Sequence, residues 1–195
     1  MRAAKIERKT NETAVTVSLE IDGTGTSELD TGIGFFDHML AQFAKQALIG
    51  LTVEAKGDLE VDEHHTVEDV GSALGAAFKK ALGGKLGIQR YGSGEVPMDE
   101  ALARVAIDLS GRSCTVFRAK FSRERVGGLP TELIAHFFEA FSRACECTLH
   151  ARVVYGENDH HKIEALFKAF GRAVKAAGAI EPRANGSLPS TKGML

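Results

Sequence analysis

The sequence predicts an α+β fold built from two similar half-domains, each a mainly antiparallel or mixed sheet with two helices packed on one face. A segment with two adjacent histidines at residues 62–68 recurs at residues 158–164, about half the chain length away. Strand-like and helix-like patterns recur around it in the same order. We therefore expect one domain over residues 1–195, with half-repeats 1–87 and 88–180 and a C-terminal tail 181–195.

Strands are predicted where apolar and polar side chains alternate. Residues 12–21 and residues 100–109 both alternate in this way, with an offset of 88 (100 minus 12). A period of two is typical of a strand with one buried face. Each half is expected to contain a further strand, near Leu51–Ala55 in the first half and Leu149–Tyr155 in the second.

Two helices in each half are predicted from apolar residues that recur three or four positions apart. The stripes of the first half are Phe35, Phe36, Met39, Leu40, Phe43 and Ala47, and then Val67, Val70, Leu74, Phe78 and Leu82. Those of the second half are Ile134, Phe137, Phe138, Phe141 and Cys145, and then Ile163, Leu166, Phe167, Phe170 and Val174.

The offset between the halves grows along the chain, which indicates an insertion. His38 and His136 occupy matching places in the first helix of each half, 98 residues apart rather than 88. Ten residues (98 minus 88) are therefore inserted ahead of the later helix, and residues 123–128 are the expected place. The glycine-rich residues 83–87 are expected to link the two halves.

The composition excludes several classes of protein. The formal net charge is −2 and the sequence pI is about 6.4, so neither a nucleic-acid-binding nor a membrane-binding surface is indicated. No apolar run approaches the roughly 18 residues that would span a bilayer, and the N-terminus has no apolar signal core. Three cysteines, an odd number, argue against a disulfide framework and favour a cytoplasmic location.

The repeated segment has the residue types and spacing of a metal site. Asp62 and Asn158 are predicted N-caps, which would place both histidine pairs in the first turn of a helix. There the positive end of the helix dipole disfavours imidazolium, and a metal needs neutral imidazole. His64 and Glu68 are four apart and share a helix face, whereas His65 lies about 100° around the helix. One helix start could therefore supply ligands to two different ions.

One further histidine in each half completes a predicted set of ligands. The set is His38, His64, His65, Glu68, His136, His160, His161 and Glu164, enough for two ions with three histidines and one glutamate each. Ligation by nitrogen and carboxylate without thiolate suits Mn, Fe, Co or Zn. A single pair of adjacent histidines is usually a surface feature without a metal. The prediction of a metal site therefore rests on the duplication of the pair. His150 is matched by Glu54 at the 96-residue offset of the histidine segments, and is expected to support a ligand or to be structural.

Several cationic and hydroxyl side chains form a candidate phosphate clamp. Arg90 follows a glycine-rich turn, Arg112 follows a predicted strand, and Lys168 lies four residues after Glu164. The tail residues 188–193 add Ser, Thr and Lys side chains. Each of these residues alone would be an ordinary surface group. No Walker or dinucleotide glycine motif is present, so nucleotide binding is not indicated.

In its sequence motifs the chain resembles the imidazoleglycerol-phosphate dehydratase family, from about Ile6 to Leu195. The resemblance rests on the segments Asn11–Thr13, Phe36–Leu40, Asp62–Asp69, Leu109–Arg112, Asn158–Ala165 and Leu188–Gly193. It implies two Mn(II) ions per subunit, with other divalent metals also able to bind. It also implies a homo-oligomer of about 24 subunits with sites at subunit interfaces.

The resemblance further implies the reaction. An imidazole bearing a glycerol phosphate side chain would lose one water to give imidazole acetol phosphate, a step of histidine biosynthesis. Two metals flanking the ring would stabilise imidazolate, which expels the neighbouring hydroxyl through a diazafulvene-like intermediate. The implied catalytic residues are Glu12, His65 and Glu164, with Glu12 as the acid/base. The implied substrate- and phosphate-binding residues are Glu12, Arg90, Arg112, Lys168, Ser190 and Lys192.

One residue departs from the family pattern, and two other functions compete with the dehydratase. Many relatives carry histidine where this chain has Gln46, so an amide replaces an imidazole that would contact the substrate hydroxyl. A dinuclear metallohydrolase could use the same ligands to activate water. A metal-storage or metal-sensing protein would need the ligands but not the phosphate clamp.

Overall fold

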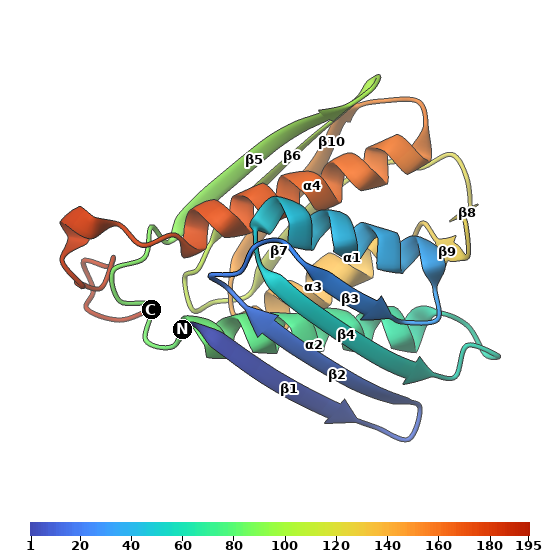
Figure 1. Ribbon diagram of the computed structural model, residues 1–195. Coiled ribbons are helices and arrows are strands. Elements are labelled where there is room, and N and C mark those ends of the chain that lie inside the picture. The colour runs from blue at the N-terminus through green and yellow to red at the C-terminus, as the bar shows by residue number, and fades with distance from the viewer.

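The computed structural model describes residues 1–195 and places four helices in a layer between two four-stranded sheets (Figure 1). The first sheet has the order β1 (Ala3–Lys9), β2 (Thr13–Glu20), β4 (Gly50–Gly57) and β3 (Ser27–Asp30). The second has the order β5 (Tyr91–Met98), β6 (Ala101–Asp108), β10 (Thr148–Tyr155) and β7 (Cys114–Arg118). In each sheet only the last strand pairs in parallel. The predicted α+β class with two similar sheets is confirmed.

The helices pack across the halves rather than within them. They are α1 (Gly34–Ala47), α2 (His64–Leu82), α3 (Leu133–Cys145) and α4 (Asp159–Gly178). Helix α2 covers β1 and β2, and α4 covers β5 and β6, whereas α2 packs on α3 and α1 packs on α4. Each helix pair therefore joins one half to the other. The four predicted helices and the four predicted strands are confirmed.

Equivalent glycines permit close crossing of these helix pairs. A Cβ added at Gly75 in α2 would lie 2.4 Å from the carbonyl oxygen of Phe141 in α3. A Cβ added at Gly171 in α4 would lie 2.6 Å from the carbonyl oxygen of Phe43 in α1. Real Cβ atoms do not approach backbone so closely, so a larger residue at either position would push the two helices apart.

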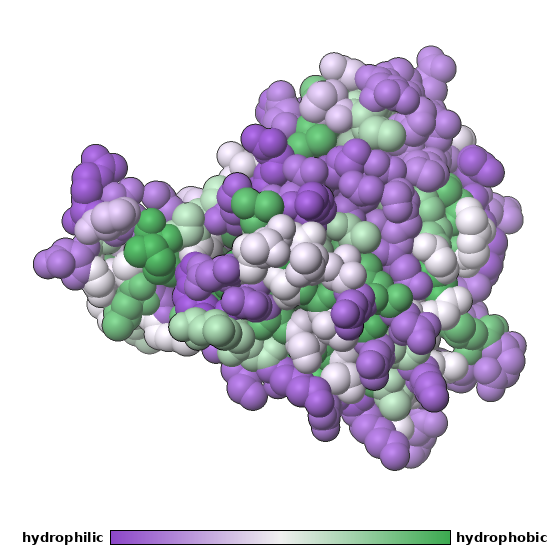
Figure 2. Space-filling view, viewed as in Figure 1, coloured by the Kyte–Doolittle hydropathy of each residue, from purple (hydrophilic) through white to green (hydrophobic).

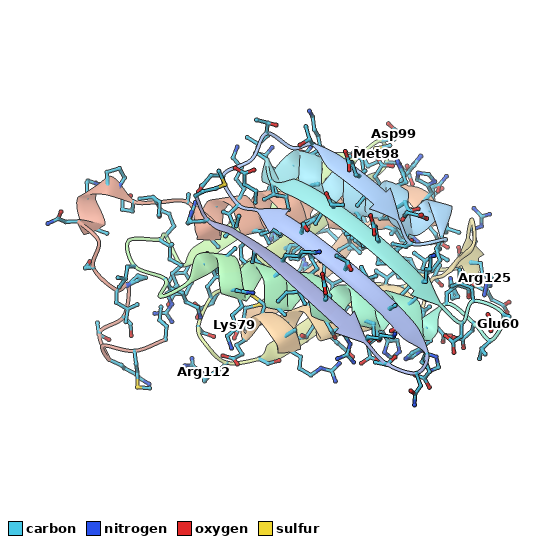
Figure 3. The ribbon with its side chains drawn as sticks, turned by 60° about the horizontal axis from the view of Figure 1, so that its bottom comes forward. Glu60, Lys79, Met98, Asp99, Arg112 and Arg125 are labelled. Carbon is cyan, nitrogen blue, oxygen red and sulfur yellow. The ribbon has the colours of Figure 1, made fainter.

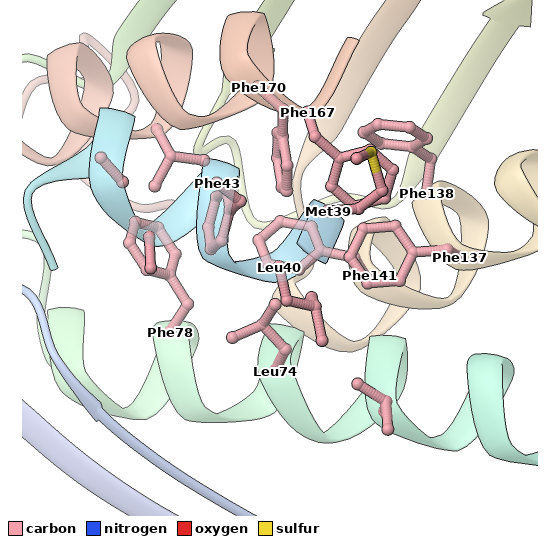
Figure 4. Packing of buried hydrophobic residues seen from close by; sticks show 14 of the residues in the cluster. Met39, Leu40, Phe43, Leu74, Phe78, Phe137, Phe138, Phe141, Phe167 and Phe170 are labelled. Atoms are coloured by element: carbon pink, nitrogen blue, oxygen red, sulfur yellow. The ribbon is translucent and has the colours of Figure 1, made fainter. Parts of the chain in front are cut away.

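Phenylalanine rings fill the space between the helices (Figure 4). The ring centroid of Phe137 in α3 lies 5.5 Å from that of Phe36 in α1 and 5.1 Å from that of Phe167 in α4. Burying a side chain of this size contributes about 1.5–3 kcal/mol to stability. This shared core fixes the helix ends that carry the histidines relative to each other.

The inserted residues form a small hairpin, β8 (Arg125–Val126) and β9 (Leu129–Pro130), between β7 and α3. The insertion therefore lies where the offset predicts. Residues 83–87 lie in the segment that connects α2 to β5. The C-terminal segment projects from the body (Figure 1), and its only regular element is the 3₁₀ turn η1 (Pro182–Ala184). No helix is long and apolar enough to cross a membrane.

His150 is separated from the other six histidines. It lies on β10, where Leu149 and Ala151 point to the core and His150 is exposed on the opposite face of the sheet. The helices that carry the other histidines cover the inner face. His150 therefore supports no metal ligand of its own chain.

Candidate metal centre

Both histidine pairs lie in the first turn of a helix, as predicted. Asn158 caps α4, and its side-chain oxygen accepts hydrogen bonds from the backbone of His160 at 2.9 Å and of His161 at 3.5 Å. Helix α2 begins one residue later than predicted, so its N-cap is Glu63 rather than Asp62. Asp62 still accepts a hydrogen bond from the His64 backbone at 2.8 Å.

The two helix starts are also held from outside by the inserted hairpin and its flanking loop. The buried Asp159 carboxylate accepts hydrogen bonds from the backbone of Ser122 and Arg123, at 2.8 and 2.7 Å. Lys162 donates to its other oxygen at 2.7 Å. Arg125 of β8 makes a two-bond ion pair with Glu63, at 2.6 and 3.0 Å. One insertion therefore contacts the residue next to each histidine pair.

The first cluster combines α4 with α1. The Glu164 Oε2 lies 3.1 Å from His160 Nε2 and 3.2 Å from His38 Nε2, and the three ligand atoms are all within 4.8 Å of one another. Burial opposes ionisation of Glu164, but Lys168, 2.6 Å from Oε1, together with His38 and His160 lowers the pKa of the carboxyl below its usual value. The carboxylate form, which a cation needs, is therefore favoured.

The second cluster combines α2 with α3 in the equivalent way. His64 Nε2 lies 3.6 Å from Glu68 Oε2, and the ring centroids of His64 and His136 are 4.8 Å apart. Arg143 of α3 donates to the other oxygen of Glu68 at 3.0 Å. Six of the eight predicted ligands thus lie in two groups of three, but only His38, His160 and Glu164 have all their ligand atoms within 4.8 Å of one another. Each cluster takes its second histidine from the opposite half.

The second histidine of each pair points away from both clusters. The ring planes of His64 and His65 are 77° apart, and those of His160 and His161 are 79° apart. The ring nitrogens of His65 and His161 contact Asp58 and Glu100, which belong to neither cluster. His65 and His161 therefore add no ligand to the clusters of their own chain.

Carboxylates face the Nδ1 atoms of these two outward histidines. His65 Nδ1 lies 3.0 Å from Asp58, and His161 Nδ1 lies 2.7 Å from Glu100. A carboxylate on Nδ1 leaves Nε2 free for a metal, which is the common arrangement in metalloproteins. These hydrogen bonds raise the pKa of both imidazoles. The predicted effect of the helix start, a lower pKa for these rings, is therefore not what the neighbouring carboxylates produce at His65 and His161.

The sequence prediction missed Asp58, Asp99 and Glu100. Asp99 lies 3.7 Å from His161 Nε2, the same distance that separates Glu12 from His65 Nε2. The offset of 88 that aligns the two alternating strands also aligns Glu12 with Glu100, so the repeat did contain a signal for Glu100. Asp58 and Asp99 lie in loops with no such pattern.

Most predicted phosphate-binding residues lie at the other end of the molecule. The Arg90 backbone donates to Ala177 at the end of α4, about 26 Å along that helix from His160. The Arg90 guanidinium is held by Asp108 at 2.7 Å and by the Pro189 carbonyl at 2.8 Å.

Arg112 lies toward the same end, opposite Arg125 (Figure 3). The tail that carries Ser190 and Lys192 folds back against the neighbouring Gly111, whose added Cβ would lie 2.4 Å from Leu195. Only Lys168, through Glu164, is beside a metal cluster. Within one chain, the predicted phosphate-binding residues therefore lie far from the predicted metal ligands, with Lys168 as the exception.

Gln46 is also distant from the clusters of its own chain. It lies in the last turn of α1, eight residues and about 12 Å along the helix from His38. Gln46 lies where α1 crosses α4: a Cβ added at Gly171 would be 2.9 Å from the Cβ of Gln46.

Comparison with known proteins gives one consistent answer. The family model described as imidazoleglycerol-phosphate dehydratase matches residues 31–174. The chain belongs to this family. An imidazoleglycerol-phosphate dehydratase from Lacticaseibacillus casei is 56% identical over the full length of both chains. One from Chloroflexus aggregans is 57% identical over all of this chain and 95% of its own.

Solved structures of the family share this fold. The dehydratase of Staphylococcus aureus superposes with a TM-score of 0.83 at 37% identity, covering 92% of this chain and 99% of its own. The Pyrococcus furiosus protein, solved in complex with (S)-C348, gives 0.82 at 31% identity, covering 97% and 100%. Dehydratases are hydro-lyases, so this member of the family is an enzyme of that class.

Proposed function

We propose that the chain dehydrates imidazole glycerol phosphate to imidazole acetol phosphate in histidine biosynthesis, with two Mn(II) ions per subunit. The observation that carries the proposal is the cluster of His38, His160 and Glu164, with the matching residues His64, Glu68 and His136 placed alongside one another where α2 packs on α3. Family membership supports the substrate, because the relatives are named for it. The phosphate-binding candidates support a phosphorylated substrate rather than metal storage.

The donor atoms fit such a metal. Each cluster offers two imidazole nitrogens and one carboxylate and contains no thiolate, a set that suits Mn(II) and other borderline divalent cations. The lowered pKa of Glu164 keeps its carboxylate ionised. When bound, the metals would act as Lewis acids on the substrate ring and stabilise its imidazolate.

The outward histidines support an oligomeric site. Each cluster contains three ligands, and His65 and His161 each present a free Nε2 that no cluster of the same chain can use. In a homo-oligomer of about 24 subunits, these atoms would complete clusters of neighbouring copies. Arg90 contacts Ala177, about 26 Å along α4 from His160, which supports the same arrangement, with the clamp supplied by another subunit.

The surface of the single chain agrees with such an assembly. Leu86, Ile180 and Met194 are exposed at or beside the tail. Figure 2 shows apolar surface on the projecting segment, whereas the exposed residues of α1 include the polar His38 and Lys45. Contiguous apolar surface of this kind is typical of protein interfaces.

The proposed chemistry assigns proton transfer to Glu12. Its carboxylate is 55% exposed and lies 3.7 Å from His65 Nε2, so it can reach a substrate bound between subunits. It would take the proton from the carbon beside the one that loses hydroxide. The resulting enol becomes the ketone, and one water leaves in total. Arg90, Arg112, Lys168, Ser190 and Lys192 would hold the phosphate throughout.

A turnover assay on imidazole glycerol phosphate tests this function. Product is expected with Mn(II) present, is lost after treatment with a chelator, and returns when Mn(II) is added back. Elemental analysis should find two metal ions per chain. Full activity in metal-free protein would refute the metal dependence. Release of inorganic phosphate would instead indicate a hydrolase, and metal binding without turnover would indicate storage.

A further inference from the structure

The turn that carries Glu12 is tied to helix α2 by a buried carboxylate. Asp69 lies four residues after His65 and is 8% exposed. One of its oxygens accepts a short hydrogen bond from the Thr13 hydroxyl, and the other accepts from Arg8 Nε at 2.7 Å. Thr13 opens β2 and Arg8 lies near the end of β1. Asp69 therefore holds both strands that lead into the turn.

The turn itself is also fixed. The Thr10 hydroxyl accepts hydrogen bonds from the backbone of Glu12 at 3.1 Å and of Thr13 at 2.9 Å. The Glu12 side chain, by contrast, accepts no hydrogen bond from its own chain; its one charged neighbour is His65 at 3.7 Å. The backbone around Glu12 is thus rigid while its carboxylate is free.

In the second half, the equivalent turn is attached to its helix by different residues. Glu100 occupies the place of Glu12, and its carboxylate accepts from the backbone of Glu157 at 3.1 Å and of Asn158 at 2.7 Å. It also contacts His161 Nδ1 at 2.7 Å. These bonds tie the β5–β6 turn to the start of α4, but they leave Glu100 no free oxygen for a substrate.

The residues around Glu100 explain why Glu100, rather than a helix residue, ties the β5–β6 turn to α4. At the offsets of the repeat, Thr13 is matched by Ala101 and Asp69 by Ala165, both of them buried. The second half therefore has no equivalent of the Thr13–Asp69 hydrogen bond. Without it, the glutamate of the turn is the group that anchors the turn.

We propose that Asp69 is a positioning residue that anchors the β1–β2 turn and so leaves Glu12 free, at a fixed place beside His65, for proton transfer. This inference rests on the proposed role of Glu12. It also accounts for the different use of the two equivalent glutamates: one half anchors its turn through a helix residue, the other through the glutamate itself.

The test uses the replacements that the second half already contains. In Asp69→Ala and Thr13→Ala, kcat is expected to fall about tenfold or more, because a displaced acid/base transfers protons poorly. KM should stay within about twofold, and metal content and subunit assembly should be unchanged. Thr13→Ser, which keeps the hydroxyl, should restore kcat. Glu7→Gln, an exposed carboxylate on β1, is the matched control with unchanged kcat.

A double-mutant cycle separates positioning from a general structural role. In a Glu12→Gln background, Asp69→Ala should have little further effect on kcat, because the residue acts through Glu12. Independent, additive effects would overturn the proposal, as would wild-type kcat in Asp69→Ala or loss of metal together with kcat. Should Asp69→Ala fail to fold, the Thr13→Ala and Thr13→Ser pair gives the same comparison. Absence of turnover in the unmodified enzyme would instead refute the proposed function.

Discussion

The two halves of the molecule carry the same His-His-x-x-Glu segment but surround it differently. In the second half, the Glu164 side chain is 6% exposed and is paired with Lys168 on the same helix. In the first half, the Glu68 side chain is 36% exposed and is paired with Arg143 on a neighbouring helix. Identical ligand residues therefore lie in different environments. The more exposed cluster glutamate, Glu68, is in the same half of the chain as Glu12.

The largest difference between the halves is expected when the two equivalent glutamates are changed. Glu12→Gln should lower kcat by about 10²–10⁴, the usual contribution of a positioned acid/base, and leave the metal content unchanged. Glu100→Gln should instead weaken metal binding about 10–100-fold, because it frees His161 Nδ1. Steady-state kinetics at saturating Mn(II) and metal content after dialysis against graded chelator separate the two outcomes. Full activity of Glu12→Gln would remove this residue from the mechanism.

The two cluster glutamates should differ in their effect on stability. Glu164→Gln and Glu68→Gln should each lose one metal ion per chain. In metal-free protein, Glu164→Gln should also lower the free energy of unfolding by about 3 kcal/mol, because Lys168 loses a buried partner. Glu68→Gln should cost less than about 1 kcal/mol, since its pair with Arg143 is at the surface. Urea denaturation measures both, and equal losses would contradict the contrast in burial.

The two helix starts should respond differently to acid. Burial opposes ionisation of Asp159, but hydrogen bonds from Lys162, Arg123 and Ser122 lower the pKa of its carboxyl to about 2. A lowered folded-state pKa gives stability that is present above about pH 4 and is lost as the pH falls toward 2.

In metal-free protein, Asp159→Asn should therefore remove about 2 kcal/mol of stability at pH 6 and much less at pH 2. Glu63→Gln, the equivalent change at the start of α2, breaks an ion pair whose Arg125 side chain is exposed, and should cost about 1 kcal/mol. Urea denaturation at the two pH values measures these differences. A similar pH dependence in both variants would show that Asp159 is not its source.

Changes at the two ends of the molecule should affect substrate binding differently. Deleting Ser190–Leu195 should raise KM about tenfold, the loss of one or two charge-assisted hydrogen bonds to phosphate, with metal content unchanged. Lys168→Met should raise KM and also disturb metal binding, because Lys168 contacts Glu164. Initial-rate kinetics with elemental analysis distinguish them. An unchanged KM in the truncated enzyme would show that the tail does not bind substrate.

Sequence patterns predicted the elements that follow a simple period and missed those that do not. β2 and β6 alternate cleanly, and the four helices have apolar stripes. β5 gave no signal because Gly92 and Gly94 interrupt it. A Cβ at Gly92 would lie 2.0 Å from a carbonyl oxygen of α4, so tertiary packing rather than strand propensity selects glycine there. The short strands β3 and β7 are too brief for alternation to be recognised.

The candidate site shows the same division. The repeat brought His38 and His136, from separate helices, into the predicted ligand set, and the structure places His38 near Glu164 and His136 near His64, each in the other half. It also put His65 and His161 in that set, and these two lie outside the clusters of their own chain. It could not predict that Asp58 faces His65 or that Asp69 anchors the Glu12 turn, because these contacts join segments distant in sequence. It also gave no sign that Arg90 contacts Ala177, about 26 Å along α4 from His160, because that contact joins segments distant in sequence.

The crossing of helices between the halves has a consequence for the history of the chain. A free-standing half would supply one histidine and one glutamate to a cluster, but the third donor would have to come from a second identical molecule. Such an ancestor could hold its cation only as a self-associated pair, with every residue present twice. Joining two copies in one polypeptide let each be mutated separately, so that one glutamate could become an anchor while its twin stayed available for chemistry.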